Sequence, residues 1–143
     1  MAVAGLPETV PDHTERLVRL ALEMLAVIGR VRDETALGLQ IRIGIASGPV
    51  MAGVIGTRKF TYDVWGDAVN LAARLEGLSA PGRILICPVC QARLARTFEL
   101  ESRGRINIKG VGMQEAWFIG RAQALDIAKS AGEGPALTRH CRE

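Results

Sequence analysis

The chain has 143 residues, of which 48% are hydrophobic and 23% are charged, and it carries a formal net charge of +3. These values are ordinary for a single soluble globular domain. The basic residues are scattered rather than clustered, so the sequence predicts no nucleic-acid partner. No apolar run approaches the roughly 18 residues of a membrane span, and the first residues lack the pattern of a secretory signal. We therefore expect a cytoplasmic protein.

The first half of the chain alternates between strand and helix patterns. Residues 1–4 are apolar and read as the tail of a strand. Apolar residues at helical spacing predict a helix over 13–32, with a stripe formed by Leu17, Leu20, Ala21, Met24, Leu25 and Ile28. Alternation over 39–45 predicts a half-buried strand. Residues 56–59 read as a hairpin tip before a strand over 60–64.

The second half continues the mixture of helices and strands. A helix is predicted over 67–75 and another, started by Pro88, over 88–96. Apolar or alternating patterns predict short strands at 84–86, 98–100, 106–108 and 115–120. Elements in this order predict an α/β (α+β) sandwich with helices packed on one sheet. Residues 121–143 turn to Ala, Gly, Pro and charged residues, and we interpret them as a flexible C-terminal tail.

The most informative stretch is the predicted junction between the strand over 60–64 and the helix over 67–75. Asp63 ends the strand, Gly66 permits a sharp turn, and Asp67 stands where a helix N-cap is expected. Asn70 and Arg74 are four residues apart and share one helix face. A carboxylate, an amide and a guanidinium thus lie close to one junction. These groups are suited to recognising a base and binding a phosphate.

Several segments together resemble the class III nucleotide cyclases. The stretch from Phe60 to Leu75, with Tyr-Asp-Val-Trp-Gly at its centre, resembles the bacterial adenylate cyclase branch. Residues 42–50, 53–56 and 104–110 are similar to further segments of the same family. The similarity runs in order through residues 1–120, which a chance motif match does not do. It implies a partial cyclase catalytic domain over 1–120, with a ferredoxin-like core and a mostly antiparallel sheet.

The resemblance implies a role for four residues. Asp63 would accept a hydrogen bond from the amino group of adenine, which guanine does not offer at that edge. Asn70 and Arg74 would orient the ribose and stabilise the charge that develops as ATP is cyclised to cyclic AMP and pyrophosphate. Lys109 would contact the terminal phosphates. Asp63, Asn70, Arg74 and Lys109 are called the nucleotide half-site below.

Each of the four residues also has a purely structural interpretation. Asp63 could stabilise the turn before the helix, and Asn70 could bond to nearby backbone. Arg74 could be a solvated helix residue, and Lys109 an edge-strand lysine that discourages aggregation.

Asp67 is assigned to capping rather than to metal binding. Trp65, Trp117 and Phe118 are interpreted as core residues rather than as a platform for a ligand.

The family's metal-binding residues have no counterpart in the sequence. Members of the family hold Mg²⁺ or Mn²⁺ with two aspartates that lie upstream of a segment resembling residues 1–7, and an upstream lysine helps to read adenine. The resemblance therefore implies the C-terminal part of a cyclase domain that begins inside a strand. Such a chain would be inactive alone and would act by completing a metal-bearing cyclase chain, as a homodimer or heterodimer. The alternatives are a non-catalytic remnant, a regulatory dimerisation partner, or a domain without a nucleotide role.

The cysteines give a weaker signal. The chain has three, an odd number, which argues against a disulfide scaffold and favours a reducing compartment. Cys87 and Cys90 form a lone C-x-x-C pair. We interpret them as a cysteine at a strand end and a cysteine at a helix start, rather than as a redox or metal-binding pair.

Overall fold

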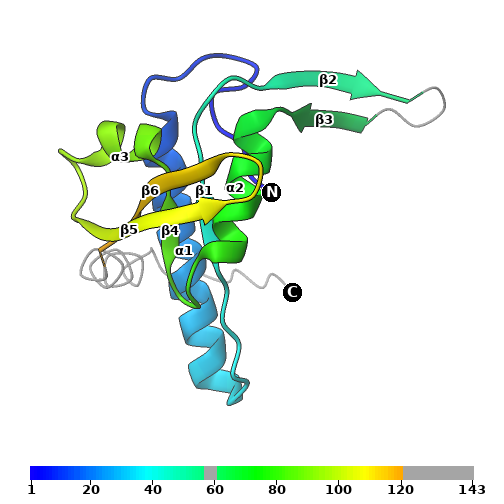
Figure 1. The fold of residues 1–143 in the computed structure, drawn as a ribbon. Coiled ribbons are helices and arrows are strands. Elements are labelled where there is room, and N and C mark those ends of the chain that lie inside the picture. The colour runs from blue at the N-terminus through cyan, green and yellow to red at the C-terminus, as the bar shows by residue number, and fades with distance from the viewer. Residues whose placement is uncertain (57–60, 121–143) are drawn as a thin grey trace, which may run out of the picture.

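The computed structural model describes residues 1–56 and 61–120 (Figure 1). They form a four-stranded sheet in the order β1-β4-β6-β5 and a separate two-stranded sheet of β2 and β3. The elements are α1 (His13–Thr35), β1 (Ile43–Ile45), β2 (Met51–Ile55), β3 (Thr61–Trp65), α2 (Asp67–Leu78), β4 (Ile84–Ile86), α3 (Pro88–Leu94), β5 (Leu100–Ile108) and β6 (Gly112–Ile119). The predicted tail over 121–143 and most of the predicted hairpin tip lie outside the described residues.

The four-stranded sheet confirms the predicted mixed α+β fold with a mostly antiparallel sheet. Strands β1 and β4 pair in parallel, whereas β4–β6 and β5–β6 pair antiparallel. Strand β4 lies between β1 and β6, and all three of its residues, Ile84, Leu85 and Ile86, are buried. Its uninterrupted apolar sequence reflects burial on both faces. Four predicted strands differ from the structure. Residues 1–4 form no strand, the strand predicted over 39–45 begins only at Ile43, and the two short strands predicted at 98–100 and 106–108 are parts of one strand, β5.

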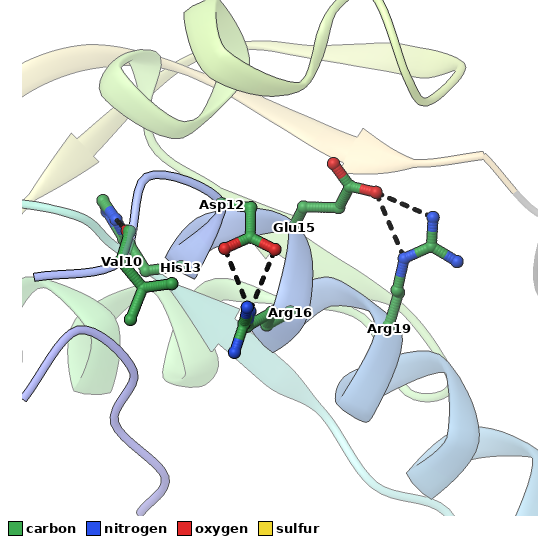
Figure 2. A network of polar contacts seen from close by, with 6 residues as sticks. All are labelled: Val10, Asp12, His13, Glu15, Arg16 and Arg19. Carbon is green, nitrogen blue, oxygen red and sulfur yellow. Dashed lines mark hydrogen bonds and ion pairs between the residues drawn. The ribbon is translucent and has the colours of Figure 1, made fainter.

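Helix α1 begins with a set of local polar contacts (Figure 2). Asp12 and Glu15 form ion pairs with Arg16 and Arg19, each one turn further along the helix, at 2.9 and 2.7 Å. The Nδ1 atom of His13 donates to the carbonyl oxygen of Val10 at 2.8 Å. Ion pairs of this spacing on an exposed face are screened by water and salt, so each stabilises the helix only slightly. They help to fix where the helix begins and contribute little to its packing.

The buried face of α1 differs from the predicted stripe. Thr14, Val18, Ala21 and Leu22 are buried, whereas Leu20 and Met24 are 41% and 44% exposed. Leu20 and Met24 instead line a groove of about 520 Å³ that also contacts β1 and α2. The helical period was predicted correctly. The side of the helix that meets the sheet, however, is rotated by about one residue relative to the predicted stripe.

Helix α2 lies directly against β1 at Gly44. A Cβ atom placed on Gly44 would lie 2.2 Å from the backbone nitrogen of Glu76 and 2.3 Å from the carbonyl oxygen of Ala72. Only glycine therefore allows the helix backbone to come so close to the strand. Leu75, on the same side of the helix, is fully buried. This contact fixes α2 on the sheet and determines which of its faces remains outside.

Strands β2 and β3 form a hairpin that extends away from the four-stranded sheet (Figure 1). They pair antiparallel from Met51 with Trp65 to Ile55 with Thr61, which confirms the predicted hairpin. Much of the apolar surface of the hairpin is uncovered. Its exposed large apolar side chains are Met51, Val54, Ile55, Tyr62 and Trp65.

The three aromatic residues predicted to lie in the core differ in burial. Trp65 is 39% exposed, whereas Phe118 is buried as expected and Trp117 is half-buried.

Candidate functional site

The junction between β3 and α2 has the predicted turn, with two corrections. Strand β3 continues to Trp65, so Asp63 lies inside the strand rather than at its end. Gly66 occupies the N-cap position, and Asp67 is the first residue of the helix. Gly66 has no side chain that could cap the helix, and the negative charge of Asp67 in the first turn is favourable near the positive end of the helix dipole. Gly66, at φ 146°, forms the tight turn itself.

Asp63 lies on the projecting hairpin. It pairs with Gly53 of β2, and its side chain is exposed. Its Oδ1 atom accepts a hydrogen bond from the backbone N–H of Val64 at 2.8 Å. Because side chains alternate along a strand, Asp63 shares one hairpin face with Trp65. The Trp65 indole lies over Gly53, where an added Cβ would come within 3.3 Å of the ring.

Asn70 and Arg74 lie on α2, on the side facing away from β1. Ala72 faces β1, and the helical repeat places positions 70 and 74 almost opposite to it. Asn70 is accordingly exposed and Arg74 is half-buried. The predicted shared face for these two residues is therefore present, and the helix contact at Gly44 is what turns it outward.

The Arg74 guanidinium reaches the turn between β5 and β6. A Cβ atom on Gly110 would lie 3.1 Å from one terminal nitrogen of Arg74 and 3.5 Å from the other. Gly110 has φ 74°, a conformation that glycine adopts without strain. Lys109 precedes it in the same turn and is exposed. Two cationic residues from elements far apart in sequence are thus brought to neighbouring positions, which favours an anionic ligand.

The nucleotide half-site lies on the surface rather than in an enclosed cavity. One cavity of about 230 Å³ is lined by the N-terminal segment, the loop after β1 and the start of α2. The groove of about 520 Å³ lies beside β1. None of the four half-site residues lines either space. A ligand held by these residues would therefore need a further surface to enclose it.

The residues that the structure describes do not provide a metal site. Within residues 1–56 and 61–120, no three His, Cys, Asp or Glu side chains are placed to hold one ion. Mg²⁺ and Mn²⁺ require several oxygen ligands in close, nearly octahedral geometry.

Sequence reasoning missed two polar contacts next to the sheet. The Nε2 atom of His13 lies 3.0 Å from the Ser47 hydroxyl, across 34 residues of sequence. Because Nδ1 of His13 donates to Val10, Nε2 of a neutral ring accepts from Ser47. The second missed contact is between the thiols of Cys87 and Cys90, whose sulfur atoms are 3.6 Å apart. No sequence pattern indicates the first contact, and the C-x-x-C spacing only permits the second.

Comparisons with known proteins place the chain in a family. The model for the adenylate and guanylate cyclase catalytic domain matches residues 1–121. An adenylate cyclase of Mycobacterium tuberculosis is 43% identical over 136 residues, which cover 94% of this chain and 31% of that protein. The chain therefore belongs to the adenylate and guanylate cyclase catalytic domain family, and it spans about a third of the length of this relative.

Solved structures agree with this assignment. The guanylate cyclase domain of RhGC from Catenaria anguillulae, in complex with GTP, matches with a TM-score of 0.76 and 34% identity over 82% of this chain and 64% of that chain. A dimeric guanylyl cyclase domain from Blastocladiella emersonii matches with a TM-score of 0.71 and 31% identity, covering 81% of this chain and 63% of the other. Among the described residues, no helix is long and apolar enough to span a membrane.

Proposed function

We propose that the chain supplies the base-reading and phosphate-binding half of an adenylate cyclase site. The observation that carries this proposal is the placement of Arg74, whose guanidinium lies against Gly110 next to Lys109. Asn70 stands one helical turn away on the same outward face. A guanidinium and an ammonium at neighbouring positions suit the phosphates of ATP, and the amide suits the ribose. Membership of the cyclase family supports the same reading.

The proposed substrate is ATP rather than GTP. Asp63 carries this choice, because a carboxylate accepts from the amino group of adenine and repels the guanine carbonyl. The relative from M. tuberculosis is named an adenylate cyclase, whereas the Catenaria domain binds GTP. The family therefore includes both specificities, and the assignment to adenine depends on Asp63.

We further propose that turnover needs a second chain. The described residues do not provide a metal site, and the half-site faces outward. Without ions to bridge the phosphates, most of the electrostatic stabilisation of phosphoryl chemistry is absent. A cyclase chain that carries metal-binding carboxylates would complete the site as the second member of a dimer. The related domain from B. emersonii has been solved both as a dimer and as a monomer.

A regulatory or non-catalytic partner is the second candidate function. The exposed apolar surface of the β2–β3 hairpin favours it, because such a surface serves association whether or not the site turns over. The two candidates differ in what they require of Arg74. A catalytic half-site needs its guanidinium, whereas a purely associating partner does not.

ATP binding by the purified chain tests the proposal. We expect no cyclic AMP from the isolated chain with Mg²⁺ or Mn²⁺, and weak ATP binding by calorimetry that is lost in Arg74→Ala. Arg96→Ala, which removes an exposed arginine just beyond α3, serves as the matched control and should leave binding unchanged. Equal binding by wild type and Arg74→Ala would contradict the half-site. Cyclic AMP formation by the pure chain, abolished in Arg74→Ala, would contradict the need for a partner.

A further inference from the structure

Two buried thiols face each other at the end of β4. Cys87 directly follows β4 and forms the N-cap of α3, and Cys90 lies in the first turn of α3. The predicted positions of the pair, one cysteine at a strand end and one at a helix start, are therefore confirmed. Their exposed fractions are 1% and 0%, and their Sγ atoms are 3.6 Å apart. A disulfide requires a sulfur–sulfur distance of about 2.05 Å, so a closure of about 1.5 Å would join them.

The two thiols have unequal surroundings. With both protonated, Cys87 donates to Cys90, and Cys90 donates to the carbonyl oxygen of Ile45 at 3.7 Å. Once Cys87 loses its proton, Cys90 becomes the donor to the resulting thiolate. That hydrogen bond lowers the pKa of the Cys87 thiol, and backbone N–H groups of Cys90, Ser47 and Val89 act in the same direction against the effect of burial. The pKa of Cys90 is raised by its hydrogen bond to Cys87 and by burial.

This arrangement separates a nucleophile from a resolving thiol. Cys87 sits where several donors hold the thiolate, which is the reactive form of a cysteine. Cys90 remains a thiol within contact distance and is the nearest partner for an oxidised Cys87. Within residues 1–56 and 61–120, no third metal-binding side chain joins the pair.

We propose that Cys87 and Cys90 form a reversible intrachain disulfide when the protein meets a hydroperoxide. The Cys87 thiolate attacks a peroxide oxygen, the O–O bond breaks, and Cys87 becomes a sulfenic acid while the peroxide is reduced to an alcohol or water. The Cys90 sulfur then attacks the Cys87 sulfur, the S–O bond of the sulfenic acid breaks as the S–S bond forms, and the Cys90 proton leaves with the hydroxyl group as water. Two thiols are thereby oxidised by two electrons, and a dithiol reductant returns them by exchange.

Access to the buried pair requires α3 to open briefly. The helix has seven residues, and its outer side is open to solvent, with Val89 50% exposed. Only Cys90 and Leu94 of the helix are buried. Short elements with few buried side chains open locally at low free-energy cost. Oxidation is therefore expected to be slow compared with that of an exposed thiol and to be faster in mild denaturant.

A peptide map of the whole chain tests the disulfide without any substitution. Trypsin cuts after Arg83 and Arg93, so both cysteines lie in one peptide, residues 84–93. The chain is treated with hydrogen peroxide, denatured in N-ethylmaleimide and digested. We expect this peptide to lose the mass of two hydrogen atoms and to carry no maleimide, and dithiothreitol before alkylation should restore two maleimides. A peptide that keeps two maleimides, or that gains oxygen on either sulfur, would overturn the proposal.

A variant series separates the two cysteines from Cys141, the third cysteine of the chain. In a Cys141→Ser background the disulfide should still form, and intact mass should show no linked dimers. Adding Cys90→Ser should stop disulfide formation and leave a Cys87 sulfenic acid that dimedone traps. Adding Cys87→Ser should leave Cys90 unoxidised. Equal peroxide reactivity of Cys90 with and without Cys87 would contradict the assigned order of the two steps. The wild-type peptide map decides the matter if a variant does not fold.

Discussion

Helix α2 and the β2–β3 hairpin both carry residues of the nucleotide half-site, but the chain holds them differently. Helix α2 touches β1 through backbone atoms at Gly44 and buries Leu75 completely. The hairpin instead leaves Val54, Tyr62 and Met51 at 64%, 57% and 63% exposure. The position of Asn70 and Arg74 is therefore fixed by the core of this chain. The position of Asp63 depends on a hairpin whose apolar surface has no cover among the described residues.

This difference separates the two tasks of the proposed site. In the proposed site, phosphate contacts would come from the anchored part, since Arg74 lies against the β5–β6 turn that also carries Lys109. Base reading would come from the projecting part. A partner that covers the hairpin would therefore sharpen the choice of nucleotide more than it would improve the phosphate contacts.

The anchor of α2 should be the most sensitive point. Gly44→Ala forces a Cβ atom into the backbone of α2, and we expect it to lower the free energy of unfolding by about 3 kcal/mol, the upper end for an overpacked core. Gly77→Ala, in the same helix but with open space around it, is the control. It should raise stability by about 0.5–1 kcal/mol. Urea unfolding measures the free energy of unfolding of both variants. A Gly44→Ala protein as stable as wild type would contradict the conclusion that the core of this chain anchors α2.

The hairpin should matter for association and not for folding. We expect the recombinant chain to self-associate through its exposed apolar surface. Val54→Lys should weaken this association by about 1.5–3 kcal/mol for each buried valine, while the unfolding free energy changes by about 0.5 kcal/mol or less. Val27→Lys, at a position on α1 that is also exposed, is the control. Sedimentation velocity measures the self-association of each variant. A wild-type chain that stays monomeric at high concentration would contradict association through the hairpin.

The smallest effect is expected at Asp63. Its substitution by cysteine should erode the preference for ATP over GTP only modestly. Asp63 is exposed and only one reader is present, so the loss should stay below the cost of about 1–3 kcal/mol for a buried polar group without a partner. Phosphate contacts from Arg74 and Lys109 should be unaffected, so total binding should fall little. Calorimetry with both nucleotides measures the ratio. Equal affinity for ATP and GTP in the unsubstituted chain would contradict base reading by Asp63 and indicate a structural role instead.

The sequence predicted the elements well where apolar pattern and turn residues agreed. The run Ile84–Ile86 marked the buried central strand, and Gly66 marked the turn before α2. The mixed fold followed from the order of these elements and from the family resemblance. The misplaced parts were those that depend on tertiary neighbours. Periodicity defines a helical stripe, but which side of α1 is buried is decided by its contacts with β1 and α3. The predicted stripe therefore included Leu20 and Met24, which are exposed.

The candidate site shows the same limit. Motif spacing put Asn70 and Arg74 on one face, but only the fold brings Arg74 to Gly110, across 36 positions in sequence. Likewise, an aromatic residue at a strand end is usually buried, yet Trp65 lies on the projecting hairpin and is partly open to solvent. Long-range contacts of this kind leave no local signature in the chain.

Complementation tests the central claim most directly. The chain is mixed with a cyclase homologue that keeps its metal-binding aspartates but has lost its own Asn/Arg pair, and cyclic AMP formation is followed at increasing chain concentration. We predict a saturable gain in turnover, reduced by about 10²–10³-fold in Arg74→Ala, the range for loss of one transition-state donor, and unchanged in Arg96→Ala. No gain over background at saturating chain, with binding between the two proteins confirmed, would contradict the half-site and leave an associating partner without a catalytic role.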